Sequence, residues 1–455
     1  LGARLGDAAP DEIVGYHFEQ AAQYRRELGA PDAALGARAA DRLWAAARAA
    51  RAREDVAAAA NLLGRTAALL AESDPRLASA LVEHGEALRQ LGELPLAGDV
   101  FARSIALAHA VNESAVEWRA RIGVAAVRIW REPEGAAQLA LDEGNAAIAA
   151  LPDDEHDVLA RAWILLGDAA LLRSQMAERM RTSEQALRHA RAAGDRALEV
   201  EIIKNLAPAM LFGDVSVEDG MRYVDDVLAR LGDVPGVRSF GLHVMGHLRA
   251  RRGEFAEARQ AIEEWRGHMK ELGRIAQHAN TAGCAYDVLS LAGDWSAAER
   301  EVREASQTLE RMGDRASRST TVAYLGVACF EQGKIDEADR CATLSGELGA
   351  SDDAMNEAIW RSLRARVLAA RGEREEAVAQ ARKAVEVADR TDYIDLQGDA
   401  RRDLAIVLGA GPDGVRALDE AIARYERKGN RVSADGARAL RLRMSGGPER
   451  AAQRQ

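Results

Sequence analysis

A short polar turn recurs along the chain at intervals of about 40 residues. Four turns show it most clearly, each centred on a glycine: Gly253, Gly293, Gly333 and Gly372. The steps between these glycines are 40, 40 and 39 residues. Glycine adopts the left-handed backbone that ends a helix, and an acidic residue behind it favours the start of the next helix. Such regular spacing predicts one supersecondary unit repeated along the chain.

The same phase extends over most of the sequence. Gly213 lies 40 residues before the first of these glycines, and Gly411 lies 39 residues after the last. Gly92 heads a similar turn, and Arg53 lies 39 residues before it. Arg173 stands near an expected turn without a glycine. The chain therefore divides into about ten units of about 40 residues.

Each turn joins two stretches that have the pattern of amphipathic helices. Residues 240–252 precede one turn and residues 255–272 follow it, with apolar residues at helical spacing and charged residues between them. Hydrophobic residues make up 48% of the chain, but aromatic residues only 4%. Alanine and leucine supply much of the apolar share and favour helices. The sequence thus predicts an all-α protein made of helical hairpins.

Small residues keep a fixed distance from the turn glycines. Seven residues before a turn glycine stand Gly85, Gly246 and Gly326. Five residues after one stand Ala97, Ala258, Ala298, Ala338 and Ala377. A small residue at these places lets the two helix backbones of a hairpin approach closely, because a large side chain would push them apart.

Three runs resemble the signature of the tetratricopeptide repeat (TPR): Gly85…Gly92…Ala97, Gly246…Gly253…Ala258 and Gly326…Gly333…Ala338. The resemblance implies a right-handed α-solenoid of TPR-like hairpins with a concave and a convex face. The units are longer than the usual ~34 residues, and the closing proline of the family is mostly missing. A generic array of the HEAT type, whose period overlaps, remains the alternative.

The repeat also suggests how the chain is divided. We expect an N-terminal helical junction or cap at residues 1–52, a solenoid at residues 53–444 and a polar tail at residues 445–455. Units near residues 130–220 are the least regular, so a change of curvature is expected there.

A second resemblance is confined to the N-terminal segment. Residues 12–21, with Tyr24-Arg25 and Glu27-Leu28-Gly29, are similar to a junction in actinobacterial signalling proteins. In those proteins a class III nucleotide cyclase or a DNA-binding domain is coupled to a STAND-type ATPase, and a TPR region follows the junction. The resemblance implies that this chain is the cytoplasmic sensor or assembly arm of such a regulator, with upstream domains of the same polypeptide as partners. A stand-alone TPR adaptor is the alternative.

Composition and missing motifs narrow the function. The chain has 61 Lys and Arg against 72 Asp and Glu, a formal charge of −11, so a basic nucleic-acid-binding domain is not expected. Three cysteines give no disulfide framework and fit a reducing compartment. No uncharged apolar run approaches the ~18 residues of a membrane span. Phosphate-binding, zinc-protease and serine-hydrolase motifs are absent, so neither catalysis nor a cofactor is predicted.

Partner binding is predicted for the concave face. In TPR arrays the first helix of each unit lines that face, and aromatic, methionine and arginine side chains suit a protein or peptide partner. Offsets from the turns place ten residues there: Trp118, Arg121, Arg128, Trp163, Met210, Phe240, His243, His247, Asn280 and Asp287.

His243 and His247 invite a third hypothesis, a metal-dependent enzyme. They stand four residues apart and share one helix face, a spacing that can ligate zinc. The sequence places no third ligand beside them, because His268 and His278 fall in other helices. Polar histidines that face the groove or are partly buried are the interpretation we prefer.

Overall fold

The computed structural model describes residues 10–132, 134–232, 234–271, 278–279, 281–350 and 353–445. All regular elements in these ranges are helices, and the predicted all-α class is confirmed. Residues 1–9 of the predicted cap and residues 446–455 of the predicted tail lie outside them. None of the helices within these ranges is long and apolar enough to cross a membrane.

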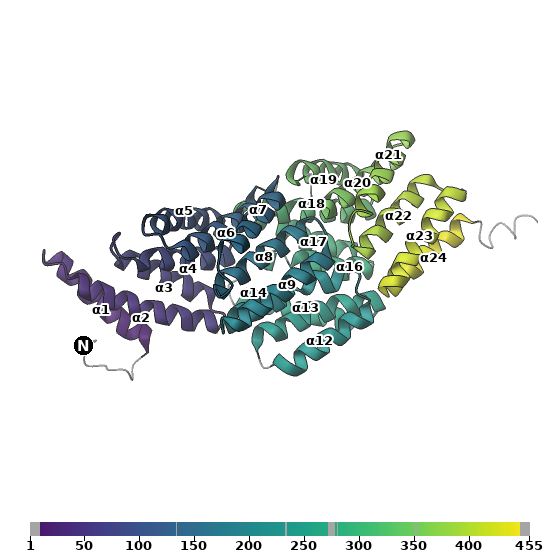
Figure 1. The fold of residues 1–455 in the computed structure, drawn as a ribbon. Coiled ribbons are helices and arrows are strands. Elements are labelled where there is room, and N and C mark those ends of the chain that lie inside the picture. Colours follow the sequence, from purple (N-terminus) through teal and green to yellow (C-terminus); the bar gives the residue numbers. More distant parts are fainter. Residues whose placement is uncertain are drawn as a thin grey trace, which may run out of the picture.

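The helices form consecutive hairpins, which confirms the α-solenoid (Figure 1). After α1 (Asp11–Glu27), the hairpins are α2 (Ala33–Ala52) with α3 (Val56–Leu69), α4 (Arg76–Leu91) with α5 (Leu94–Ala110), α6 (Ser114–Arg131) with α7 (Ala136–Ala150), α8 (His156–Leu172) with α9 (Met176–Ala192), α10 (Arg196–Asn205) and α11 (Ala207–Phe212) with α12 (Val217–Leu231), α13 (Pro235–Arg252) with α14 (Phe255–Glu271), α16 (Ala282–Leu291) with α17 (Trp295–Met312), α18 (Arg315–Glu331) with α19 (Ile335–Leu348), α20 (Ala354–Ala370) with α21 (Arg374–Ala388), and α22 (Ile394–Leu408) with α23 (Pro412–Lys428). The helix α24 (Arg431–Met444) follows.

The turns inside the hairpins fall where the repeat predicts them. A left-handed backbone, with φ from 75° to 88°, is adopted by Gly92, Gly253, Gly293, Gly333 and Gly372. Two turns that lack glycine keep this geometry: Glu54 has φ 62° and Ser174 has φ 53°. The left-handed backbone thus occurs at two turns without glycine, whereas Gly213 (φ −68°) and Gly411 (φ −154°) do not adopt it.

Close packing between units depends on glycine as well. The Phe101 ring is fully buried between Gly85 of α4 and Gly123 of α6. A Cβ atom would lie 2.7 Å from the ring at Gly85 and 2.5 Å from it at Gly123. No side chain fits at either position unless the ring moves.

We therefore expect Gly123→Ala to lower the free energy of unfolding by about 1–3 kcal/mol in urea denaturation, since overpacking displaces the ring. Gly98→Ala in α5 is the matched control, because its Cβ would meet Val127 at an ordinary 4.0 Å. The control should be neutral or more stable by up to about 1 kcal/mol, the gain in helix propensity. Equal effects of the two changes would contradict this packing account.

The array curls until distant units touch. The helix α2 contacts α10, α6 contacts α18, α11 contacts α22, and α13 contacts α24. Arg51 pairs with Asp195, and Arg251 with Asp395, each at 2.8 Å and across 144 residues of sequence. In Figure 1, α1 and α24 nonetheless lie at opposite ends of the molecule.

The fold is least regular between α10 and α12. Pro208 stands in the first turn of α11, so the first helix of this unit is broken after Asn205 into two short pieces. Behind the break, the carbonyl groups of Met210, Gly213 and Val215 accept hydrogen bonds from the buried ammonium of Lys428 at the end of α23. The irregular unit is thereby joined to the C-terminal hairpin.

Candidate functional site

The curled array surrounds a cavity of about 510 Å³, called here the central cavity. The ends of α2, α4, α6, α8, α10 and α13 supply most of its wall, and α14 and α16 contribute Trp265, Met269 and Cys284. This volume lies in the range typical of ligand pockets. The first helices of six units therefore face one shared space.

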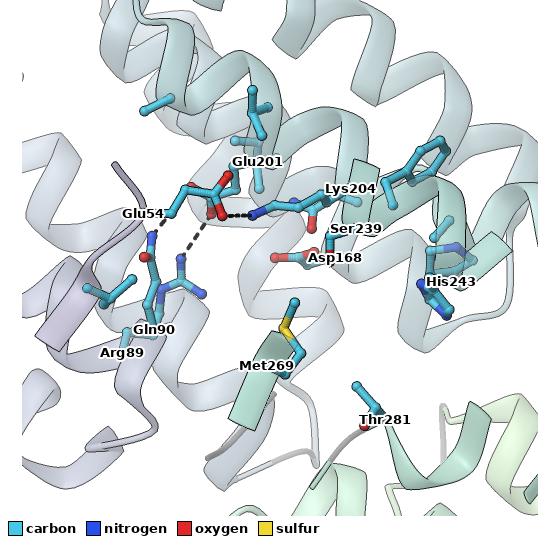
Figure 2. Close-up of a pocket in the computed structure, with 18 of the residues that line it drawn as sticks. Glu54, Arg89, Gln90, Asp168, Glu201, Lys204, Ser239, His243, Met269 and Thr281 are labelled. Atoms are coloured by element: carbon cyan, nitrogen blue, oxygen red, sulfur yellow. Dashed lines mark hydrogen bonds and ion pairs between the residues drawn. The ribbon is translucent and has the colours of Figure 1, made fainter. Parts of the chain in front are cut away.

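One wall of the central cavity is polar (Figure 2). Lys204 of α10 pairs with Glu54 in the α2–α3 turn at 3.8 Å. Arg89 of α4 pairs with Glu201 of α10 at 3.5 Å, and Gln90 donates to the same carboxylate. These are long contacts between partly exposed groups, a kind of ion pair that contributes about 0–1 kcal/mol. Charged groups of a ligand could therefore replace them at little cost.

Two further polar residues of the wall, Arg179 and Ser239, are buried. The Arg179 guanidinium is buried and donates to the Gly167 and Asn205 carbonyl groups, so it joins neighbouring units. Ser239 is also buried and lines the cavity, but its Oγ has no hydrogen-bond partner in the part of the chain that the structure describes. Arg179 is therefore held by these carbonyl groups, and the Ser239 hydroxyl is enclosed behind the cavity surface.

The remaining wall is apolar and partly aromatic. It includes Trp130, Ile164, Leu171, Val200, Phe240, Trp265 and Met269. Tryptophan, phenylalanine and methionine are enriched where proteins bind other chains. An apolar side chain of a ligand would lose its water shell here.

His243 and His247 lie at the edge of this wall and are held in fixed positions. The His243 ring stacks on Trp265, with ring centroids 3.9 Å apart, and its Nε2 lies 3.2 Å from Cys284 Sγ. His247 Nδ1 lies 2.6 Å from Asp287 Oδ2, and the same oxygen accepts from Arg251 Nη1 at 2.8 Å.

The protonation states in this group follow from burial and charge. Burial lowers the pKa of His243 well below its usual value, so its imidazole is neutral at pH 7. Burial raises the pKa of the Cys284 thiol to about 12. Burial would also raise the pKa of Asp287, but Arg251 and His247 more than offset it and hold that pKa below its usual range. Asp287 is therefore a carboxylate.

Of the residues predicted for the partner site, Phe240 and His243 line the central cavity. His247 and Asp287 stand directly behind His243. Met210 is a core residue with 2% of its surface exposed. Asn280 lies outside the described residues.

The other four predicted residues do not line the cavity. Arg121 lies over the Trp118 ring at 4.0 Å and pairs with Glu143. Arg128 pairs with Glu132 at 3.4 Å, and Arg181 lies 5.5 Å over the Trp163 ring. These four residues therefore do not share the cavity wall with Phe240 and His243.

The sequence interpretation missed the polar wall. Three residues of the cavity wall stand three positions before a turn: Arg51, Arg89 and Leu171 hold this place relative to Glu54, Gly92 and Ser174. Among the predicted residues of the first helices, Met210 holds this position relative to Gly213, but it lies in the core. Because the array curls tightly, the ends of these helices come closest to its centre.

No family model and no curated protein matches the chain. Among solved structures, a Rap protein complexed with competence and sporulation factor is similar over 84% of this chain and 100% of its own, with 14% identity and a TM-score of 0.51. The Cut9–Hcn1 hetero-tetramer of APC/C (11% identity, 97% and 95% covered, TM-score 0.48) and yeast Tom70 (14% identity, 98% and 96% covered, TM-score 0.36) are also similar. The likeness to the Rap protein shows the fold: this chain is an α-solenoid of TPR-like hairpins.

Proposed function

We propose that this chain is a non-enzymatic scaffold that binds a peptide or protein segment in the central cavity. One observation carries the proposal. The ends of six first helices build a single cavity that joins an aromatic and aliphatic wall to a wall of loosely paired charges. Such a surface suits a chain that brings both apolar and charged side chains.

The chemistry of the wall indicates the kind of ligand. Trp130, Phe240 and Trp265 provide apolar area for anchoring side chains. Lys204 and Arg89 can turn from their present partners toward a ligand carboxylate. A short linear peptide with at least one large apolar side chain and one acidic group fits this set. The Rap protein of similar fold was solved in complex with competence and sporulation factor, which is consistent with this use of the fold.

We further propose that the scaffold is the sensor or assembly arm of a cytoplasmic signalling regulator. Its support is the similarity of residues 12–29 to the junction that precedes TPR regions in STAND-type and cyclase proteins. Occupation of the cavity would favour one curvature of the array over another, since a ligand acts through its different affinities for two states. An ATPase motif in the same reading frame ahead of Leu1 would support this role; a frame without one would favour a stand-alone adaptor.

A cavity-filling variant tests the binding proposal. Linear peptides would be selected from a random display library on the full chain and their affinities measured by fluorescence anisotropy. Ala197 of α10 lines the cavity and is half-buried, so Ala197→Trp should fill the space and weaken selected peptides at least tenfold, about 1.4 kcal/mol.

The matched control is Ala146→Trp, at an exposed position of α7 outside the cavity wall. It should leave peptide affinity unchanged, and both variants should keep the wild-type melting temperature. Selection of no peptide, or equal affinities for the two variants, would refute binding in the central cavity.

A further inference from the structure

Three side chains that can ligate a metal meet beside the central cavity. His243 and His247 come from α13, and Cys284 comes from α16 of the next unit. One nitrogen of each histidine and the cysteine sulfur lie within 4.8 Å of one another. His243 and Cys284 are 41 residues apart, about one repeat, so the stacking of units brings the sulfur to the histidines.

His247 has one ring nitrogen without a hydrogen-bond partner among the described residues. Its Nδ1 faces the Asp287 carboxylate, which has no proton to give, so Nδ1 carries the hydrogen of their 2.6 Å contact. The other nitrogen, Nε2, is buried and has no hydrogen-bond partner among the described residues. His247 as a whole is 0% exposed, so water does not replace that partner. Histidine ligands of metals are oriented in this way, with a carboxylate on one nitrogen and the metal on the other.

His243 and Cys284 already have spacing suited to zinc. Tetrahedral zinc with bonds of about 2.0 Å to nitrogen and 2.3 Å to sulfur separates these two ligands by about 3.5 Å. His243 Nε2 and Cys284 Sγ lie 3.2 Å apart, and stacking on Trp265 fixes the imidazole ring. These two ligands would need to move only slightly to share one ion.

A second group of residues could also ligate a metal: Glu299, Cys329 and Glu337. Its carboxylates, however, already have cationic partners. Arg303 bridges the two carboxylates at 2.7 Å each, and Lys334 binds Glu299 as well. Two cationic side chains already neutralise that group, so it gives no reason to expect a metal.

We propose that His243, His247 and Cys284 bind one zinc ion, with His247 contributing Nε2. Nitrogen and sulfur donors favour zinc over magnesium or calcium, which prefer oxygen. Three protein ligands leave a fourth position. Since His243 and Cys284 line the central cavity, that position faces the cavity and is filled by water or by a donor group of a bound ligand. The zinc proposal does not depend on peptide binding, so either proposal can be refuted while the other stands.

The test uses the full chain, stripped with a chelator and then given Zn²⁺ or Co²⁺ alone. We expect one zinc ion per chain by elemental analysis, and a thiolate-to-cobalt charge-transfer band with Co²⁺. Cys284→Ser should abolish the band and weaken zinc at least tenfold in competition with a chromogenic chelator. Asp287→Asn should weaken zinc about 10–100-fold, the usual effect of losing a carboxylate behind a histidine ligand.

Two other cysteines provide matched controls. Cys341→Ser and Cys329→Ser change buried free thiols of α19 and α18 and should leave zinc affinity and the cobalt band unchanged. Substoichiometric zinc and no charge-transfer band in the wild-type chain would overturn the proposal. So would wild-type zinc affinity in Cys284→Ser. Should that variant fail to fold, the wild-type band and stoichiometry decide alone.

Discussion

Replacing Arg251 with methionine should lower the free energy of unfolding by about 3–5 kcal/mol, the usual effect of removing one partner of a buried ion pair. The Arg251 side chain is 3% exposed. Its Nη1 lies 2.8 Å from Asp287, and its Nε lies 2.8 Å from Asp395. Methionine fills most of the space but leaves two carboxylates without their cation. Because Asp395 belongs to α22, the substitution also removes an ion pair between α13 and the C-terminal units.

Urea denaturation at pH 7 measures this effect, with Arg252→Met as the matched control on the same helix. Arg252 pairs with Glu254 at 2.9 Å, but both side chains are about one-third exposed. Its loss should change stability by about 1 kcal/mol or less. If the two variants were equally stable, the buried Arg251 network would not hold the array closed.

The loss of unfolding free energy in Arg251→Met should also depend on pH. Arg251 and His247 outweigh burial and hold the folded-state pKa of Asp287 below its usual range. The stabilisation from this carboxylate is therefore present above its unfolded pKa, about 3.9, and is lost as the pH falls through the folded value. The stability difference between wild type and Arg251→Met should accordingly narrow as the pH drops below about 4.

Lys428→Met should cost about 2–4 kcal/mol, because it leaves buried carbonyl groups without a donor. Lys428 is 1% exposed. Its ammonium donates to the Gly213 and Val215 carbonyl groups at 2.7 Å and to that of Met210 at 3.2 Å. Burial lowers its pKa to about 8, so at neutral pH it stays mostly protonated, with one hydrogen for each carbonyl.

Arg427→Met is the matched control, because it removes an exposed ion pair between the same two parts of the chain. Arg427 pairs with Asp214 across this interface, but its side chain is 61% exposed. Its loss should have little effect in the same urea experiment, within about 1 kcal/mol. Amide hydrogen exchange should rise in α11 and α23 for Lys428→Met alone. Similar exchange in both variants would mean that the ammonium does not join these helices.

The sequence predicted the hairpins well because they depend on local contacts. Glycine turns and the small residues beside them act within one unit or between neighbours, as Gly85 and Gly123 do around Phe101. The turn at Glu54 follows from the phase even without a glycine. Neither the Arg51–Asp195 nor the Arg251–Asp395 pair could be foreseen, because each depends on small rotations added over several units.

The site was predicted only in part for the same reason. The repeat placed Phe240 and His243 on the inner face, and both line the cavity. Met210 falls in the core because the break before α11 turns it inward. Residues one repeat apart on neighbouring first helices meet side by side, as His247 and Asp287 do across 40 residues. That rule, applied to His243, gives Gly283, the residue next to Cys284.

Photo-crosslinking tests binding in the central cavity most directly. A selected peptide carrying a benzophenone group would be irradiated with the wild-type chain, and the adducts mapped by mass spectrometry. We predict adducts on cavity residues of α4, α10 and α13, such as Gln90 and Phe240. Adducts confined to outer helices such as α5, α7 or α12 would contradict the account.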